Sequence, residues 1–184
     1  IADAKRGDIG NTSARYAKAF FENYGVDAVT ISPYMGRDSI EPFLSFKDKY
    51  AVLLALTSNE GSRDFQYHQE KGVPLYEKVL RLSVKFKNSH KLMYVVGATK
   101  SENIKLIRMI IPDSFLLIPG VGAQGGSLKD VVQNGINTKC GLLVNSSRGI
   151  IYASEGTDYA KKAAEKAFGL QKEMSEYLKL FKII

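Results

Sequence analysis

Three charged side chains near the start of the chain have the types and spacing of a catalytic cluster. Asp3 and Lys5 are two residues apart in a stretch that has the pattern of a strand end, and Asp8 follows the break at Gly7. Side chains two residues apart leave the same face of a strand. We therefore predict a lysine framed by two carboxylates, which favour its charged form, in a strand-to-helix segment where α/β folds keep their chemistry. A surface cluster of structural ion pairs is the alternative.

A glycine-rich stretch later in the chain has the pattern of an anion-binding loop. The spacing Gly120-x-Gly122-x-x-Gly125 matches a dinucleotide fingerprint, but residues 139–141, about twenty positions on, hold no acid for a ribose. A phosphate cradle is the better interpretation, because glycines let backbone N–H groups approach an anion at a helix N-terminus. Arg148 would add a bidentate clamp. Two tight turns and a surface arginine remain the alternative.

Alternating apolar and helical segments position these residues. After the opening strand, short apolar strands are expected at 27–31, 50–56, 92–96, 115–118 and 142–144. Helices are expected at about 12–24, 38–46, 74–88, 101–111, 127–134 and 158–182, and 57–72 is expected to be a loop. Short, nearly all-apolar strands that alternate with helices predict a parallel sheet covered by helices.

Two α/β architectures fit six such units. A (β/α)₈ TIM barrel needs about 250 residues, so 184 residues fit one domain, 1–184, that carries strands 3 to 8 and lacks about the first two βα units. An open doubly wound sheet needs no missing part. The start in mid-strand favours the incomplete barrel. The loops at 120–126 and 146–149 then follow strands 7 and 8, where that fold usually binds phosphate.

Composition limits the class of protein. With 45% hydrophobic and 24% charged residues, the chain can bury a full core, and no apolar window is long enough to cross a bilayer. A single cysteine, Cys140, cannot form an internal disulfide, which suits a cytoplasmic location. The net charge of +7 favours an anionic partner. The lysines are dispersed, so we expect neither nucleic acid nor a membrane as that partner.

Four separated motifs together give the chain a family resemblance. It resembles orotidine 5′-phosphate decarboxylase in Asp3-x-Lys5-x-x-Asp8-Ile9-x-x-Thr12, Thr57-Ser58-Asn59-Glu60-Gly61, Pro119-Gly120-Val121-Gly122-Ala123-Gln124-Gly125-Gly126 and Arg148. The further segment Ser32-Pro33-Tyr34-Met35-Gly36 resembles the divergent bacterial branch of that family. The first motif alone is less specific, because magnesium-dependent sugar-phosphate decarboxylases and hexulose-phosphate synthase share it.

The resemblance implies roles for the residues of the first motif. Lys5 would be the proton donor and Asp3 the carboxylate beside the group that is lost. Asp8, with Ile9 and Thr12, would reach into the active site of a neighbouring subunit. The family is a homodimer with composite sites, and it uses no metal or cofactor.

The resemblance also implies where substrate is held. Ser58 would hydrogen-bond the pyrimidine, and Gln124 would bridge base and phosphate. Arg148 would bind the phosphate, with Gly122 and Gly149 on the two adjoining loops. We therefore expect Lys5, Gln124 and Arg148 to share one cavity.

The implied reaction is the decarboxylation of orotidine 5′-phosphate to UMP, a carbon–carbon lyase step of pyrimidine synthesis. The loss of CO₂ leaves a carbanion that fixed charges must stabilise. Two alternatives stay open: a magnesium-dependent sugar-phosphate lyase of the same suprafamily, and a non-catalytic module that binds phosphate or nucleotide.

Overall fold

A computed structural model describes residues 1–122 and 125–184 of the chain. Six strands of these residues form one parallel sheet in the order β1-β2-β3-β6-β7-β8. The strands are β1 (Ala2–Arg6), β2 (Ala28–Ile31), β3 (Tyr50–Leu56), β6 (Leu92–Val96), β7 (Leu116–Pro119) and β8 (Leu142–Asn145). The predicted α/β fold with parallel strands is confirmed.

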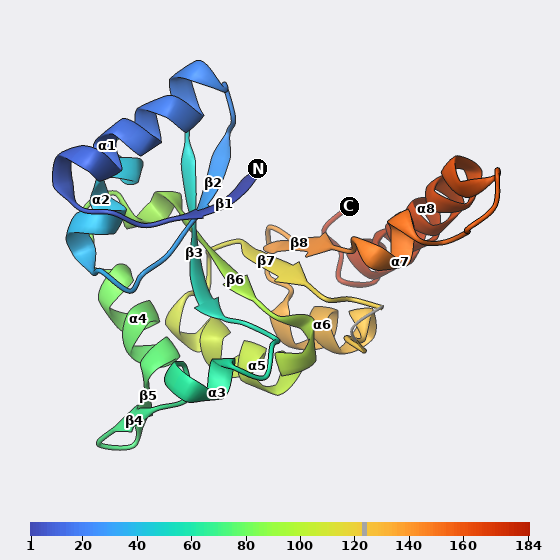
Figure 1. The fold of residues 1–184 in the computed structure, drawn as a ribbon. Coiled ribbons are helices and arrows are strands. Elements are labelled where there is room, and N and C mark those ends of the chain that lie inside the picture. Colours follow the sequence, from blue (N-terminus) through green and yellow to red (C-terminus); the bar gives the residue numbers. More distant parts are fainter. Residues whose placement is uncertain (123–124) are drawn as a thin grey trace.

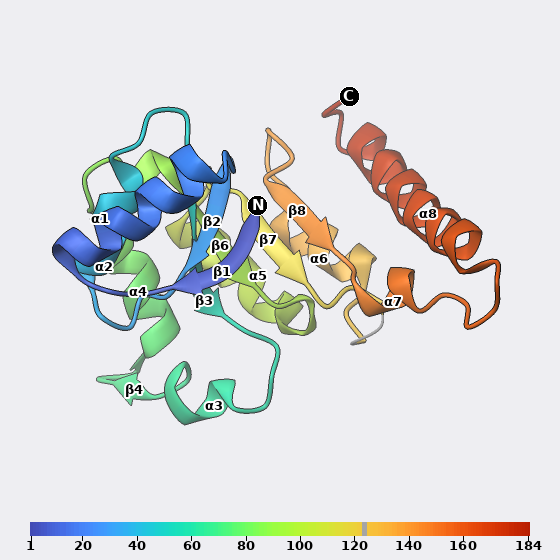
Figure 2. The same ribbon diagram turned by 45° about the horizontal axis from the view of Figure 1, so that its top comes forward.

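Helices follow the strands, and all but the last two cover one face of the sheet (Figure 1). They are α1 (Gly10–Lys18), continued by the π-helical turn Ala19–Asn23, α2 (Arg37–Leu44), α4 (Leu75–Ser83), α5 (Ser101–Ile110), α6 (Leu128–Gly135), α7 (Arg148–Ile151) and α8 (Tyr159–Leu180). Turning the molecule shows α8 beyond β8, at the end of the sheet opposite α1 and α2 (Figure 2).

Alternation along the strands divides the core into two parts. On β3, Ala51, Leu53 and Ala55 pack in the large cluster beneath the helices. Val52 belongs to a smaller cluster on the opposite face, together with Ala28, Met93 and Val95, and Leu54 packs against it. Because the sheet is apolar on both faces over most of its width, the strands after β1 have the near-continuous hydrophobic sequences from which they were predicted.

The opposite face is the inner face of a curled sheet. Residues of both edge strands, Asp3 and Lys5 of β1 and Leu143 and Asn145 of β8, line a single cavity. A flat sheet would hold these edges four strands apart. The structure is therefore a partial barrel, as predicted, with β1 and β8 as its edges in the described residues.

The segment 57–72 is more ordered than predicted. It contains a short helix, α3 (Ser62–Phe65), and it enters a two-stranded hairpin of β4 (Gln69–Glu70) and β5 (Val73–Pro74). Pro74 therefore precedes α4 instead of lying in its first turn. Helix α4 ends at Ser83, five residues before the predicted end, because separate turns follow through Asn88.

Candidate active site

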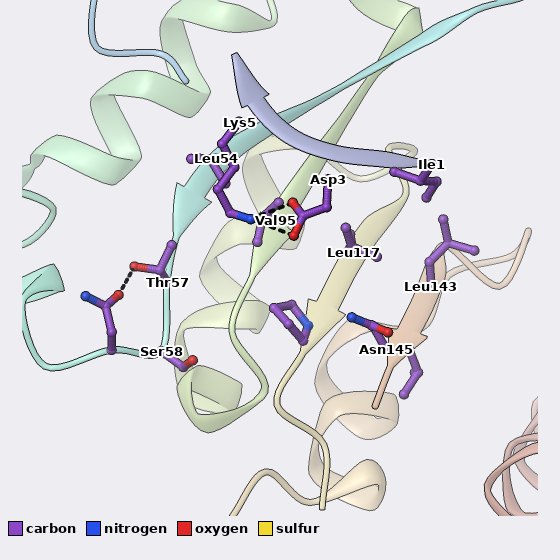
Figure 3. A pocket seen from close by; sticks show the side chains of 13 residues that line it. Ile1, Asp3, Lys5, Leu54, Thr57, Ser58, Val95, Leu117, Leu143 and Asn145 are labelled. Carbon is purple, nitrogen blue, oxygen red and sulfur yellow. Dashed lines mark hydrogen bonds and ion pairs between the residues drawn. The ribbon is translucent and has the colours of Figure 1, made fainter. Parts of the chain in front are cut away.

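The inner face holds a cavity of about 470 Å³ at the carboxyl ends of the strands. Side chains from β1, β3, β6, β7 and β8 line it, and Figure 3 shows Asp3, Lys5, Ser58 and Asn145 around it. The apolar floor comes from Leu54, Val95, Leu117 and Leu143. An apolar cavity with a few converging polar groups is the usual form of a small-molecule site.

Asp3 and Lys5 form an ion pair inside this cavity. The Lys5 Nζ donates to both carboxylate oxygens of Asp3, at 2.6 Å each. The hydrogen bond from Lys5 lowers the pKa of Asp3, and the Thr30 hydroxyl and the charge of Lys5 act in the same direction against partial burial. Both side chains are more than half exposed, at 66% for Asp3 and 53% for Lys5, so the pair contributes little to stability.

The backbone of Lys5 is strained where this pair forms. Lys5 has φ +46°, a left-handed conformation that costs a non-glycine residue roughly 1–2 kcal/mol. The β1–β2 register also shifts between Ala2 and Arg6. The buried Thr30 of β2 accepts a hydrogen bond from the Lys5 N–H at 2.9 Å and donates to Asp3 Oδ1 at 2.9 Å. An exposed ion pair stabilises the fold by less than this strain costs. Such uncompensated strain is typical of functional sites.

Asp8 does not complete the predicted pair of carboxylates around Lys5. Its Oδ1 accepts a hydrogen bond from the N–H of Ile9 at 2.8 Å, and among the described residues Lys5 has its ion pair with Asp3 alone. β1 ends at Arg6, so Asp8 lies beyond the strand that carries Asp3 and Lys5. Ile9 and Thr12 are exposed on the same segment, and Asp8, Ile9 and Thr12 are not among the described residues that line the cavity.

Ser58 lies in the cavity because a hydrogen-bonded loop and a close glycine hold it there. Gln66 binds Thr57 twice: its Oε1 accepts from the Thr57 N–H and its Nε2 donates to Thr57 Oγ1, each at 2.8 Å. The Thr57 hydroxyl donates to Asn59 at 2.5 Å (Figure 3). A Cβ added to Gly97 would lie 2.8 Å from Ser58 Cβ and from its backbone nitrogen. Neither Gln66 nor Gly97 stood out in the sequence.

Arg148 lies at a second, smaller cavity of about 70 Å³, together with Gly120, Val121, Ser146 and Ser147. The expectation that Lys5 and Arg148 share one cavity is therefore wrong. The two cavities adjoin, because Pro119 and Asn145 line both. In the described part of the chain Arg148 is exposed and has no carboxylate partner. Gly149 follows it in α7, and Gln124 lies outside the described residues.

The glycine-rich loop differs from the predicted cradle of free N–H groups. Gly122 donates to Gly126 O at 2.9 Å, Gly125 donates to Gly122 O at 2.8 Å, and Gly126 donates to Gly120 O at 3.2 Å. Gly122 and Gly125 have φ of +79° and +82°, a conformation that glycine adopts readily. The loop thus satisfies these three donors internally, as backbone groups must, and an anion would be bound here chiefly by Arg148.

Comparison with known proteins identifies the family of this chain. Residues 1–163 match the family described as "Orotidine 5'-phosphate decarboxylase / HUMPS family". The chain belongs to this family. It is 62% identical over 178 residues to an orotidine 5′-phosphate decarboxylase of Flavobacterium johnsoniae, an alignment that covers 97% of this chain and 65% of that relative.

Solved structures of the orotidine 5′-phosphate decarboxylase family have the same fold. A putative orotidine-monophosphate-decarboxylase of Toxoplasma gondii gives a TM-score of 0.80 at 33% identity, over 96% of this chain and 68% of that one. Leishmania donovani UMP synthase gives 0.79 at 39% identity, over 89% of this chain and 36% of that one. The chain thus spans just under two thirds of the Flavobacterium relative and about a third of the Leishmania chain.

Two further findings concern the described residues. They hold no group of three or more His, Cys, Asp or Glu side chains placed to bind a metal ion. Among them, no helix combines the length and the apolar character that a membrane crossing requires.

Proposed function

We propose that this chain carries the catalytic centre of an enzyme that decarboxylates orotidine 5′-phosphate to UMP in the pyrimidine pathway of the cytoplasm. The observation that carries the proposal is the Lys5–Asp3 ion pair, 2.6 Å long, in a largely apolar cavity that adjoins the cavity of Arg148, which among the described residues has no carboxylate partner. Relatives that are 62% and 60% identical to this chain bear the name of that activity, and the solved structures compared above share its fold at 33–39% identity.

The Lys5–Asp3 pair can perform the chemical step. The bond between C6 and the carboxylate carbon breaks, CO₂ leaves, and the electron pair stays on C6. The Lys5 ammonium stabilises this charge and then transfers a proton from Nζ to C6; solvent reprotonates the amine. Asp3, beside the substrate carboxylate, would disfavour the bound substrate relative to the transition state, in which that charge has dispersed.

The adjoining cavity suits the other end of the same substrate. In a nucleotide a ribose lies between the base and the phosphate. Two adjoining sites, one for each group, therefore suit this substrate better than a single site. Ser58 would bind the pyrimidine, and Arg148 with Gly149 would bind the phosphate. Gln124, on the same loop as Gly122, would bridge the base and the phosphate. Binding energy gained at the phosphate can then be used for the reaction at C6.

Asp8, Ile9 and Thr12 fit a contribution to a second subunit. Asp8 accepts a hydrogen bond from the Ile9 N–H and forms no ion pair with Lys5 among the described residues, and Ile9 is 57% exposed at the start of α1. An exposed isoleucine beside a carboxylate and a threonine hydroxyl suits a contact in which the polar groups enter a partner's site. We infer a homodimer with composite sites, each subunit a single barrel domain whose described strands are strands 3 to 8.

The test is the loss of orotidylate absorbance in the presence of EDTA, with purified protein that carries residues 1–184. Lys5→Ala should abolish turnover. Lys78→Ala is a matched control, because Lys78 also forms a half-exposed 2.6 Å ion pair, with Glu70, but lies on α4 away from the cavity. Turnover that survives in Lys5→Ala would refute the assignment of the proton donor.

The same assay tests the phosphate site and the alternatives. Arg148→Ala should lower kcat/KM by orders of magnitude, while Arg81→Ala, which breaks an exposed pair with Glu77, should leave it unchanged. Equal kinetics of the two variants would remove the phosphate assignment. Inertness toward orotidylate with magnesium-stimulated turnover of a sugar phosphate would identify the lyase, and UMP binding without any turnover would identify the non-catalytic module.

A further inference from the structure

The β1–β2 ladder is interrupted at one point, which coincides with the candidate catalytic pair. Ala2 pairs with Val29 and Arg6 pairs with Ile31. Three residues of β1, Asp3 to Lys5, therefore stand opposite one residue of β2, which is Thr30. Such a bulge re-aims side chains and leaves backbone groups without their ladder partners.

The side chain of Thr30 supplies a missing ladder partner. Its Oγ1 accepts the Lys5 N–H at 2.9 Å, a bond that a backbone carbonyl would accept in a regular ladder. A hydroxyl has one proton to donate, and the Thr30 Oγ1 lies 2.9 Å from Asp3 Oδ1 but 3.5 Å from the Ala2 carbonyl oxygen. The proton therefore goes to the Asp3 carboxylate.

We propose that Thr30 is a positioning residue, which holds the strained Lys5 backbone and the Asp3 carboxylate together so that ammonium and carboxylate meet in the cavity. Thr30 acts through both members of the pair and need not touch substrate. It is 1% exposed, on a strand whose four residues are all buried, so its side chain has little freedom. The claim that this positioning serves catalysis depends on the function proposed above.

No other charged side chain on these two strands competes for the pair. β2 carries none, and the remaining charge of β1, Arg6, has its guanidinium over the rings of Tyr16 and Phe20. Among the described residues that line the cavity, Asp3 and Lys5 have the charged side chains. A change in the titration of Asp3 on substitution of Thr30 can therefore be attributed to the lost hydrogen bond and its effect on Lys5.

The first experiment measures the pair directly, without substrate. The Asp3 carboxyl carbon is titrated by NMR in ¹³C-aspartate-labelled protein and assigned with Asp3→Asn. Thr30→Val preserves the branched shape but removes the hydroxyl, so the pKa of Asp3 should rise toward its ordinary value. Thr30→Ser should restore the wild-type titration. Ser83→Ala is the control, because it also removes a buried hydroxyl hydrogen bond, to Tyr94 on the helix-covered face, and should leave Asp3 unchanged.

The second experiment measures orotidylate turnover in the same variants. Thr30→Val should lower kcat about 10- to 100-fold, the effect of losing a hydrogen bond to a charged group, with little change in KM, because Thr30 is not among the described residues that line the cavity of Arg148. Thr30→Ser should stay within a few-fold of wild type. A Thr30→Val protein that matches Ser83→Ala in both Asp3 titration and kcat would overturn the proposal.

A measurement on the wild type remains decisive if Thr30→Val does not fold. The Lys5 amide proton should exchange slowly with solvent, because the Thr30 hydroxyl is its acceptor. Exchange as fast as that of an exposed amide would overturn the proposal. If the wild type does not consume orotidylate but the Asp3 titration still depends on the Thr30 hydroxyl, the positioning role stands and the proposed function fails.

Discussion

Arg108 of α5 should be among the most sensitive residues of the fold. Its guanidinium donates to four backbone carbonyls: Nε to Gly135 at 2.6 Å, Nη1 to Ile111 at 3.1 Å and to Ser114 at 2.5 Å, and Nη2 to Gly141 at 2.7 Å. These carbonyls belong to the ends of α5 and α6 and to the segments that lead into β7 and β8. Arg108 therefore holds together the part of the sheet that bears Pro119, Asn145 and Arg148.

The expected loss of stability can be estimated from the carbonyl groups that lose their hydrogen-bond donor. Arg108→Met retains the apolar stem but removes all four donors. The Gly141 carbonyl also accepts from the Leu116 N–H at 2.9 Å, so three carbonyls lose their donor. At about 1 kcal/mol for each partly buried acceptor, the free energy of unfolding should fall by about 3 kcal/mol. For a chain of this length, that lowers Tm by roughly 6–12 °C.

Urea unfolding followed by circular dichroism measures this loss. Arg81→Met is the control, since its exposed pair with Glu77 on one helix contributes only about 0.3–0.5 kcal/mol. Arg108→Lys should be intermediate, because one ammonium cannot reach carbonyls on so many segments. Burial lowers the pKa of Arg108 to about 10, so the comparison belongs near pH 7, where the side chain is charged. An Arg108→Met loss no larger than that of Arg81→Met would refute the reasoning.

Two further predictions concern a buried hydroxyl and a close contact. Burial raises the pKa of Tyr94 to about 12, so its contribution to stability is complete below pH 10 and is lost as pH rises toward 12. Between pH 10 and pH 12 the free energy of unfolding, measured with urea, should fall by about 2–3 kcal/mol more in the wild type than in Tyr94→Phe. An equal fall in the two proteins would contradict this prediction. Gly97→Ala should displace Ser58, which its Cβ would approach to 2.8 Å, and weaken UMP binding measured by calorimetry; unchanged affinity would show that Ser58 does not bind the base.

The strands and the Asp3–Lys5 pair could be predicted because both depend on local spacing. Apolar runs such as Tyr50–Leu56 give a buried strand wherever they fall in the sheet. Two residues of separation direct Asp3 and Lys5 to one face of β1 whatever β1 pairs with. The hairpin at Gln69–Glu70 escaped prediction, because two-residue strands have no period to detect.

The tertiary structure alone decided what surrounds that pair. Thr30 is 25 residues from Lys5 in sequence and meets it only because the β1–β2 register shifts at that point. The curl of the sheet likewise decided that the proposed sites for base and phosphate are two cavities, both lined by Pro119 and Asn145. The direction of a side chain on a strand follows from local backbone geometry, so it can be read from the spacing of residues in the sequence. Strand register and curvature come from the packing of the whole sheet, so no local pattern contains them.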